Sequence, residues 1–385
     1  MKLLVVVPGA MFDAALPLLK ALSKRVELYC LFDVFLHSKN LLELEPGDMN
    51  STLVKALDVP KMQKYKDYIP LNNSYIVSLS SPKDLFKVLR GQIKILTLVR
   101  NLSPDHIYFY NVPYLAYLPT YLLSHVRKSI AVHDPIFHSG QKSVFYYSLL
   151  RKIVFSRCKN FFLFSESLVK PFIQKYKIPS EFVHLTSLGV YDQLNLYASN
   201  DLIKTEKDDN LKILFFGRIQ PYKGVSYLLK AYKKIVEKGL NNKVELSILG
   251  KGHIESDIID FLTPGLHINN SFISTNDLVH ALQQADIIIC PYTDATQSGV
   301  IMTSFALLKP VIATNVGGLG EMIEDGKTGI LIKPCDVDAI YDSIMDFYKN
   351  RDLLDAMSSN IYQSYYLGAK SWNSIADRLI NKIMK

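Results

Sequence analysis

Short apolar segments alternate with segments of helical periodicity, and this pattern occurs twice along the chain. In the first half, β-rich runs begin at Leu3, Val26, Ser74, His106, Ser129, Phe161 and Phe182. After a polar stretch, runs begin again at Leu211, Val244, Leu266, Asp286, Pro310 and Gly329. Runs that are apolar at nearly every position are typical of parallel strands covered by helices on both faces. We therefore predict an α/β fold with two doubly wound, Rossmann-like domains facing each other across a cleft.

The length of 385 residues also favours two domains, because one hydrophobic core usually stops growing at roughly 250 to 300 residues. We assign residues 1–190 to the N-terminal domain and residues 211–365 to the C-terminal domain. Residues 191–210 between them are polar, charged and without periodicity, which indicates a linker. In such sheets ligands bind at the carboxyl ends of the strands, near the point where the strand order reverses.

Two apolar segments raise the question of a membrane. Residues 106–126 are long and apolar enough to suggest a membrane span, but Pro113 and Pro119 fit better with a strand followed by a helix that has proline in its first turn. The N-terminal run MKLLVVVPGA is too short for a span and lacks an A-x-A cleavage pattern. We interpret it as the first strand, which places the protein in the cytoplasm.

Composition adds a charge asymmetry to this picture. Apolar residues make up 49% of the chain and charged residues 21%, as in soluble globular proteins. The four cysteines, Cys30, Cys158, Cys290 and Cys335, lie far apart and are interpreted as buried reduced thiols. Residues 1–200 hold 24 Lys and Arg against 14 Asp and Glu, whereas the remainder holds 20 against 22. A basic half can attract nucleic acid or an anionic membrane, or can simply be solvated, and the sum does not decide.

The first candidate for chemistry is LFFGRIQPYKG, residues 214–224. The strand ends at Phe216, Gly217 permits a tight exit, and Arg218 and Lys223 lie in the loop before the helix opened by Gly224. Two cations thus converge where free N–H groups of a helix start already favour an anion, and a diphosphate fits this place. Two surface cations flanking a turn would give the same sequence.

The second candidate is the segment ADIIICPYTDATQSGV, residues 285–300. A strand ends at Pro291, and a helix is expected to start near Ser298 and Gly299, with Thr296 or Ser298 as its cap. Unpaired N–H groups at that start can bind phosphate or sugar oxygens. Both segments therefore indicate one anion site.

Histidines form a third candidate in the first half. His133 and Asp134 end the run SIAVHD and should lie at the carboxyl edge of the sheet, with His138 five residues after His133. A buried histidine with satisfied hydrogen bonds is the alternative for His133. A metal site of His133, Asp134 and His138 is possible in principle, but no further carboxylate cluster supports it.

Together these motifs resemble the retaining glycosyltransferases of family 4, which have the two-domain GT-B fold. The resemblance lies in residues 215–223, in LGKG at residues 249–252 and in the segment at residues 295–332, and so covers most of residues 211–333. The first half resembles the family more diffusely, through the Gly9 loop and AVHDPIFHSG. The segment SWNSIADRLINKIM resembles the closing helix of the family, so residues 366–385 are expected to pack back on the N-terminal domain.

The resemblance implies roles for individual residues. Arg218 and Lys223 would bind the donor diphosphate and take part in catalysis with His133, which would contact the transferred sugar or the reacting centre. The expected donor-binding residues also include Gly9, Gly217, Gly250, Lys251, Ile273, Gln297, Ser298, Gly299, Val300 and Thr303. Asp134 and His138 are assigned to the acceptor region. No metal and no cofactor are expected, since the nucleotide-sugar is itself the donor substrate.

The chain departs from the family at one point. Many members carry two glutamates eight residues apart, and alignment on KPVIAT puts Ala295 and Thr303 in their places. A threonine hydroxyl can make one ribose hydrogen bond, but a weaker one than a carboxylate. The nucleotide therefore stays open. A family subgroup has an S-G-V segment in place of the first glutamate, so an inactive enzyme is not inferred.

We therefore expect a retaining glycosyltransferase that transfers a sugar to a saccharide or polyprenyl-diphosphate-linked acceptor in cell-surface polysaccharide biosynthesis. The alternatives are a nucleotide-sugar epimerase of the same fold and a catalytically silent glycosyltransferase-like subunit. No nucleic-acid partner is expected. Lys83, Lys87, Arg90 and Lys94 recur at helical spacing beside apolar residues, and such a helix can lie on an anionic membrane at its inner face. An amphipathic helix packed on the first sheet is the alternative.

Overall fold

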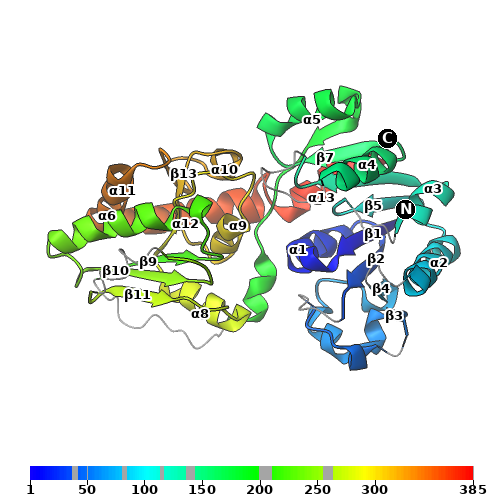
Figure 1. Ribbon diagram of the computed structural model, residues 1–385, viewed down its shortest axis with the longest axis horizontal. Helices are drawn as coiled ribbons and strands as arrows, with labels where there is room; N and C mark the ends of the chain where they lie inside the picture. Colours follow the sequence, from blue (N-terminus) through cyan, green and yellow to red (C-terminus); the bar gives the residue numbers. More distant parts are fainter. Residues whose placement is uncertain are drawn as a thin grey trace. The chain divides into compact units, whose positions relative to one another are not determined.

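A computed structural model describes residues 1–36, 42–49, 51–79, 85–112, 117–135, 144–198, 210–254 and 263–384 (Figure 1). The chain divides into two compact units. The first comprises Met1–Leu188 and Trp372–Lys385, and the second comprises Gly189–Ser371. Each unit is built on its own sheet of mainly parallel strands, flanked by helices. The predicted α/β fold with two doubly wound domains is confirmed.

The first unit contains an eight-stranded sheet in the order β3-β4-β2-β1-β5-β6-β7-β8. Its strands are β1 (Lys2–Pro8), β2 (Glu27–Val34), β3 (Leu53–Lys55), β4 (Ser74–Ser78), β5 (His106–Phe109), β6 (Arg127–Val132), β7 (Asn160–Leu163) and β8 (Val183–Leu185). All seven runs predicted in this half form strands. The edge strand β3 pairs antiparallel with β4 and was not predicted, because three partly exposed residues leave no apolar run.

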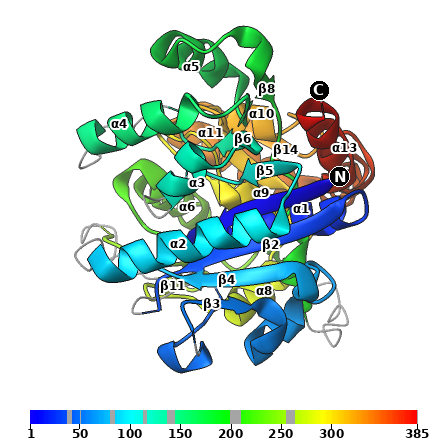
Figure 2. The same cartoon turned by 90° about the vertical axis from the view of Figure 1, so that its right-hand side faces the viewer.

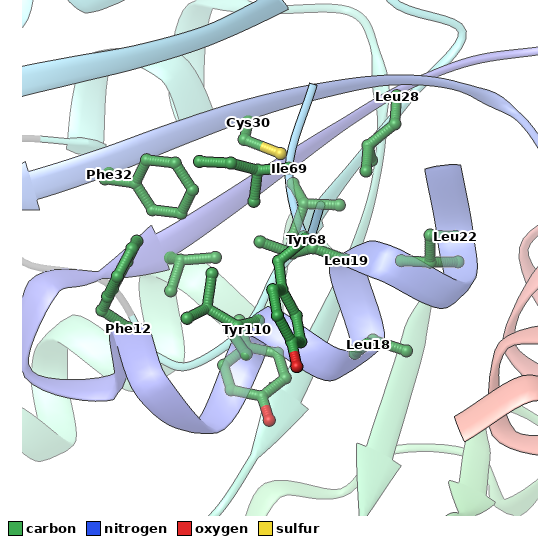
Figure 3. Packing of buried hydrophobic residues seen from close by; sticks show 14 of the residues in the cluster. Phe12, Leu18, Leu19, Leu22, Leu28, Cys30, Phe32, Tyr68, Ile69 and Tyr110 are labelled. Atoms are coloured by element: carbon green, nitrogen blue, oxygen red, sulfur yellow. The ribbon is translucent and has the colours of Figure 1, made fainter. Parts of the chain in front are cut away.

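Helices cover both faces of the first sheet. They are α1 (Phe12–Ser23), α2 (Leu85–Leu102), α3 (Leu118–Leu123), α4 (Val144–Phe155), α5 (Val169–Tyr176) and α13 (Trp372–Ile383). On one face, α1 and α13 share a core with alternate residues of β1 and β2, and Figure 3 shows Phe12 and Leu19 of α1 near Phe32 and Cys30 of β2. On the other face, residues of α2, α3, α4 and α5 share a second core. Figure 2 shows α2 and α4 in front of the strands of this sheet.

Helix α13 returns to the first unit by an apolar face. Trp372, Ile375, Leu379 and Ile383 recur at helical spacing and are buried in the core around α1. The Arg25 guanidinium donates two hydrogen bonds to the Asp377 carboxylate, with N–O distances of 2.6 and 3.0 Å. This exposed pair fixes the register of the two helices more than it adds stability, since surface ion pairs contribute little.

The second unit contains a six-stranded, wholly parallel sheet in the order β11-β10-β9-β12-β13-β14. Its strands are β9 (Leu211–Phe216), β10 (Val244–Leu249), β11 (Leu266–Asn269), β12 (Ile287–Cys290), β13 (Val311–Thr314) and β14 (Gly329–Ile332). Its helices include α6 (Val225–Glu237), α8 (Thr275–Gln284), α9 (Gly299–Ala306), α10 (Leu319–Met322), α11 (Val337–Lys349) and α12 (Asp352–Ile361). All six predicted runs form strands, and the strand order reverses between β9 and β12.

Two junctions connect the units. Residues 191–198 of the predicted linker belong to the second unit, where the N–H of Tyr191 donates to the Met302 carbonyl at 3.3 Å and Leu194 is buried. Residues 199–209 lie outside the described residues. After α12, a π-helical segment, Tyr362–Leu367, leads to α13, and the Tyr365 hydroxyl donates to the Met322 carbonyl at 2.5 Å.

The structure also decides three smaller expectations. Residues 106–126 form β5 and then α3, with Pro119 in the first turn of the helix, as predicted; Pro113 lies outside the described residues. Among the described residues, no helix is long and apolar enough to cross a membrane. The prediction of buried thiols is confirmed for Cys30 and Cys290, whereas Cys158 is only half-buried. It is wrong for Cys335, which is exposed in the turn between β14 and α11.

Candidate functional site

The candidate site of the second unit lies at the carboxyl ends of its central strands. Gly217 follows β9, Gly250 follows β10 and Pro291 follows β12. The strand order reverses between β9 and β12. In sheets of this kind ligands bind at the carboxyl ends of the strands, near such a reversal.

Two glycines allow the loops after these strands to lie very close together. A Cβ on Gly250 would stand 1.7 Å from the carbonyl oxygen of Gly217, and a Cβ on Gly224 would stand 1.8 Å from that of Pro291. Both glycines also have positive φ angles, +151° and +68°. No other residue fits at either position without displacing backbone, so the glycines bring the three loops together.

Lys223 lies within this group of loops. It ends a short 3₁₀-helix, Pro221–Lys223, and its Nζ stands 3.6 Å from the ring centroid of Tyr292 and 5.2 Å from that of Tyr222. The pKa of Lys223 is lowered to about 8, mainly by burial; Cys290 acts to raise it, and the charge of Arg218 acts to lower it. Desolvation makes the charged amine costly, so an anion that pairs with it would be strongly favoured.

The start of α9 reaches the same place. Ser298 is the N-cap residue, as predicted, but its hydroxyl does not cap the helix and donates instead to the Tyr292 hydroxyl at 3.4 Å. The first turn contains no acidic residue. The helix start therefore keeps its partial positive charge, and Tyr292 connects it to Lys223.

The contacts bring part of the predicted donor set together. Gly217 lies beside Gly250 and also beside Val300, whose Cγ2 stands 3.8 Å from the position of a Cβ on Gly217. Arg218 is exposed in the same loop, and its charge acts on Lys223. Lys251 contacts the loop after β9 through its backbone, because its carbonyl accepts a hydrogen bond from the N–H of Ile219 at 3.0 Å.

The other predicted donor residues lie on neighbouring elements. Gln297 is half-buried just before Ser298, and Gly299 is exposed as the first residue of α9. Thr303 is buried one turn further along α9. Ile273 is half-buried after β11, two strands away from β9. Whether these residues contact a donor stays a prediction.

The first unit places Gly9 at the end of β1. Its N–H donates to Oδ1 of Asp33 at 3.1 Å, and the Tyr117 hydroxyl donates to Oδ2 at 3.0 Å. Burial raises the pKa of the Asp33 carboxyl to about 7, although both hydrogen bonds act to lower it. Asp33 therefore holds the turn after β1, and the donor role predicted for Gly9 stays a prediction.

His133 is buried at the end of β6. Its ring stacks on Phe164 with centroids 4.3 Å apart, and its Nε2 lies 2.9 Å from the carbonyl oxygen of Tyr110. Because a carbonyl oxygen only accepts, Nε2 carries the proton, and Nδ1 is left as an acceptor. Burial lowers the pKa of His133 to about 4, with Asp134 acting to raise it. The imidazole is therefore neutral at physiological pH.

The acceptor residues are only partly described. Asp134 is exposed beside His133, and His138 lies outside the described residues. In the part of the chain that the structure describes, no group of three or more His, Cys, Asp or Glu could hold a metal ion. The alternative of a site with His138 is not decided by this observation.

Sequence reasoning did not find Tyr292, Asp33 or Tyr117. Tyr292 follows a buried strand at the point where the sheet order reverses, and an aromatic ring at such a strand exit is a usable signal. Asp33 is the one acidic residue within the buried part of β2, and a charged residue in an apolar strand is a second signal. Tyr117 had no such signal, because its contact with Asp33 joins residues 84 positions apart.

The comparisons with known proteins agree with this geometry. Residues 200–364 match the family model of the glycosyl transferases group 1. Over this region the chain is similar to that family. The predicted resemblance is confirmed at this level and for the GT-B fold, whereas membership of family 4 and retention of configuration stay predictions.

Three curated relatives support the assignment. An uncharacterized glycosyltransferase of Methanocaldococcus jannaschii is 28% identical over 184 residues, 46% of this chain and 45% of the relative. The alpha-D-kanosaminyltransferase of Streptomyces kanamyceticus is 24% identical over 197 residues, 49% of this chain and 50% of the relative. These alignments span about half the length of either relative. A second uncharacterized glycosyltransferase of M. jannaschii is 21% identical, and that alignment covers 91% of both chains.

Solved structures share the fold over the full length. HepE of Anabaena, crystallised in complex with UDP, has a TM-score of 0.69 at 16% identity, with 100% of both chains covered. The UDP-GlcNAc 2-epimerase of Neisseria meningitidis, bound to UDP-GlcNAc, has a TM-score of 0.57 at 14% identity, also over 100% of both chains. The fold is therefore shared with a protein that binds UDP and with an epimerase, and the function must be argued from the site.

Proposed function

We propose that the protein is a retaining glycosyltransferase that transfers a sugar from a nucleotide-sugar to a saccharide acceptor. One observation carries this proposal: Lys223, the exposed Arg218 and the uncapped start of α9 meet where the strand order of the second sheet reverses. Such a place suits a diphosphate, because it offers two cations beside the positive end of a helix. The relatives named as glycosyltransferases and the UDP bound by HepE support the same donor class.

In this proposal Arg218 and Lys223 act through their charge, and His133 acts through a hydrogen bond. As the bond from the sugar to the diphosphate breaks, negative charge grows on the leaving phosphate, and Arg218 and Lys223 would stabilise it. The acceptor hydroxyl oxygen bonds to the same sugar carbon, and its proton passes to an oxygen of the leaving phosphate. Neutral His133 would accept a hydrogen bond from a sugar hydroxyl at Nδ1. The products are the glycosylated acceptor and a nucleoside diphosphate.

The surroundings of Lys223 favour transfer over epimerisation. The rings of Tyr222 and Tyr292 lie beside its amine. Burial raises the pKa of the nearby Cys290 thiol to about 11 and also raises the pKa of Tyr292, so that these two groups are uncharged near neutral pH. An epimerase needs acid and base groups beside the sugar. The presence of both Arg218 and Lys223 argues against a silent subunit, because two cations can stabilise the charge on a leaving diphosphate.

We further propose an acceptor carried on polyprenyl diphosphate, a role in cell-surface polysaccharide biosynthesis, and a position at the cytoplasmic face of the membrane. The basic first unit supports this assignment, because it suits an anionic bilayer. No metal or cofactor enters the proposal. Turnover should therefore persist in excess EDTA, and a strict requirement for added divalent cation would contradict this part.

The test starts from the donor. Thermal shift with a panel of sugar nucleotides should single out a donor, because a ligand that binds only the folded state raises its melting temperature. With that donor, chromatography should detect release of the nucleoside diphosphate, accelerated by an acceptor. Conversion of the donor into an epimer would support the epimerase instead. A chain that binds nucleotides but never releases the diphosphate, with any acceptor of a broad lipid-linked and free saccharide panel, would support the silent subunit.

A further inference from the structure

Helix α2 has two apolar faces, although packing on the sheet uses only one. Ile95, Leu98 and Val99 are buried in the core beneath the helix. The opposite side carries Phe86, Leu89 and Ile93, whose exposed fractions are 90%, 55% and 57%. Their spacing of three and four residues places them in one row along the helix, which we call the outer stripe. The packing predicted from the sequence is confirmed for the face that carries Ile95, Leu98 and Val99. Binding of a membrane by the other face stays a prediction, and Lys83, which belongs to that prediction, lies outside the described residues.

The charges of α2 are all positive. The helix contains Lys87, Arg90, Lys94 and Arg100 and no Asp or Glu. At 100° per residue, Arg90 and Lys94 lie along one flank of the outer stripe, and the Lys94 amine donates to the Ser51 hydroxyl at 2.7 Å. An apolar row bordered by cations matches the boundary between lipid phosphates and acyl chains.

The charge of the whole unit points to the same partner. The first unit holds 27 Lys and Arg against 14 Asp and Glu, so an anionic surface would attract it as a whole. A protein partner of ordinary composition would leave the cations of α2 unmatched. Three large apolar side chains in a row on a water-exposed face are otherwise a liability for solubility.

The position of α2 adds a functional reason. The helix follows β4, which runs parallel to β2 and β1, so its first turn is at the edge of the sheet where the strands end. Gly9 and His133 lie at that same edge. Phe86, the most exposed residue of the stripe, is in this first turn. Binding by the outer stripe would therefore hold this edge close to the lipid surface.

We propose that the outer stripe of α2 docks the first unit on an anionic lipid bilayer, with Phe86, Leu89 and Ile93 at the boundary of the acyl chains and Arg90 and Lys94 on lipid phosphates. The proposal deepens the proposed function, and it rests on that function for the lipid-linked acceptor. The docking itself rests on the outer stripe of α2 and on the positive charge of the first unit.

Flotation of the full-length protein with vesicles tests the docking. The protein should bind vesicles that contain phosphatidylglycerol at low salt, bind poorly to pure phosphatidylcholine, and be released by high salt. Replacing the stripe by Phe86→Ser with Leu89→Ser should reduce binding about tenfold or more. Leu185→Ser with Leu367→Ser is the matched control, because both leucines are exposed but lie off α2, and it should bind like the wild type.

A second pair of variants tests the charges. Arg90→Glu with Lys94→Glu should remove the preference for anionic lipid, whereas Lys170→Glu with Lys175→Glu on α5 makes the same charge change elsewhere in the unit and should have a much smaller effect. Thermal unfolding of each variant shows that it is folded. Equal binding to neutral and anionic vesicles, or full binding by the stripe variant, overturns the proposal.

Self-association and nucleotide binding complete the design. If sedimentation shows a wild-type dimer that Phe86→Ser dissociates, a second copy covers the stripe and the membrane proposal is wrong. Nucleoside diphosphate affinity is measured on the same samples. Loss of vesicle binding with intact nucleotide affinity concerns the docking alone, whereas a wild-type protein that binds vesicles but no nucleotide contradicts the proposed function and leaves the docking in place.

Discussion

The two units have the same kind of sheet but opposite net charge. The second unit holds 17 Lys and Arg against 22 Asp and Glu, whereas the first holds 27 against 14. Yet it is the acidic second unit that places Arg218 and Lys223 at its strand ends. In the basic first unit, His133 and Asp33 lie at the corresponding ends of the strands, and both are buried. For a small anion such as the proposed diphosphate, a few side chains at the strand ends therefore matter more than the net charge of the domain, which acts on extended anionic surfaces.

Burial has different consequences for the charge at the strand ends of the two units. It lowers the pKa of His133 to about 4, so this side chain is neutral, and it lowers the pKa of Lys223 only to about 8, so the amine keeps most of its charge at pH 7. The strand ends of the first unit thus offer hydrogen bonds, and the strand ends of the second unit offer charge. We expect neutral hydrogen-bonding groups to bind sugar hydroxyls and charged groups to bind the diphosphate.

The largest effect should come from removing Arg218 and Lys223, the two cations at the strand ends of the second unit. Arg218→Ala with Lys223→Ala should abolish turnover and weaken nucleoside diphosphate binding by about tenfold or more, since hydrogen bonds to charged groups contribute about 1.5–3 kcal/mol each. Calorimetry measures the affinity. Lys230→Ala with Lys238→Ala removes two exposed cations on or just after α6 and is the control. Unchanged affinity in the first pair would remove the phosphate assignment.

A smaller effect, of a different kind, is expected from replacing His133 at the strand ends of the first unit. His133→Ala should lower the rate of transfer about tenfold while leaving nucleotide affinity unchanged, because a lost hydrogen bond to the sugar affects the reacting complex. Steady-state kinetics and calorimetry separate the two quantities. His184→Ala, a histidine of the same unit bonded to Asn160, is the control. Full activity of His133→Ala would make it a structural histidine.

The pH dependence sharpens the comparison further. Bound diphosphate favours the charged form of Lys223, so affinity should be highest below pH 8 and should fall about tenfold between pH 7 and pH 9 as the free amine loses its proton. Lys223→Arg keeps its charge throughout and should show a flat profile. A wild-type affinity that does not change between pH 7 and pH 9 would contradict the role of Lys223. His133, neutral in this range, should add no step.

The smallest effect concerns the close approach of the loops. Gly224 and Gly239 have nearly the same φ, +68° and +70°, but a Cβ meets the Pro291 carbonyl only at Gly224. Gly239→Ala should cost about 1–2 kcal/mol of unfolding free energy from backbone strain alone. Gly224→Ala should cost more and also weaken nucleotide binding severalfold, because the loop that carries Lys223 is displaced. Equal losses in both variants, by thermal unfolding and calorimetry, would show that the contact with Pro291 is unimportant.

Much of this protein is readable in its sequence because the information is local. Buried parallel strands are continuous apolar runs, so all thirteen predicted strands appear, and a glycine after a strand marks the exit that Gly217 and Gly250 make. The motif around Arg218 and Lys223 is local as well, and it identifies the donor-binding region. The short edge strand β3 and the exposure of Cys335 were missed, since three residues or a single turn carry too little local pattern.

The tertiary structure decided what depends on residues far apart in the chain. Tyr292 lies under the amine of Lys223, and Tyr117 bonds Asp33, only because parallel strands bring their ends to one edge of a sheet. The desolvation that sets the pKa values of Lys223 and His133 likewise depends on the whole surrounding shell. For α2, the sequence determined the helical spacing of apolar and basic residues, but only packing showed that Ile95 and Leu98 point to the sheet and Phe86 to solvent, because burial is a property of the fold.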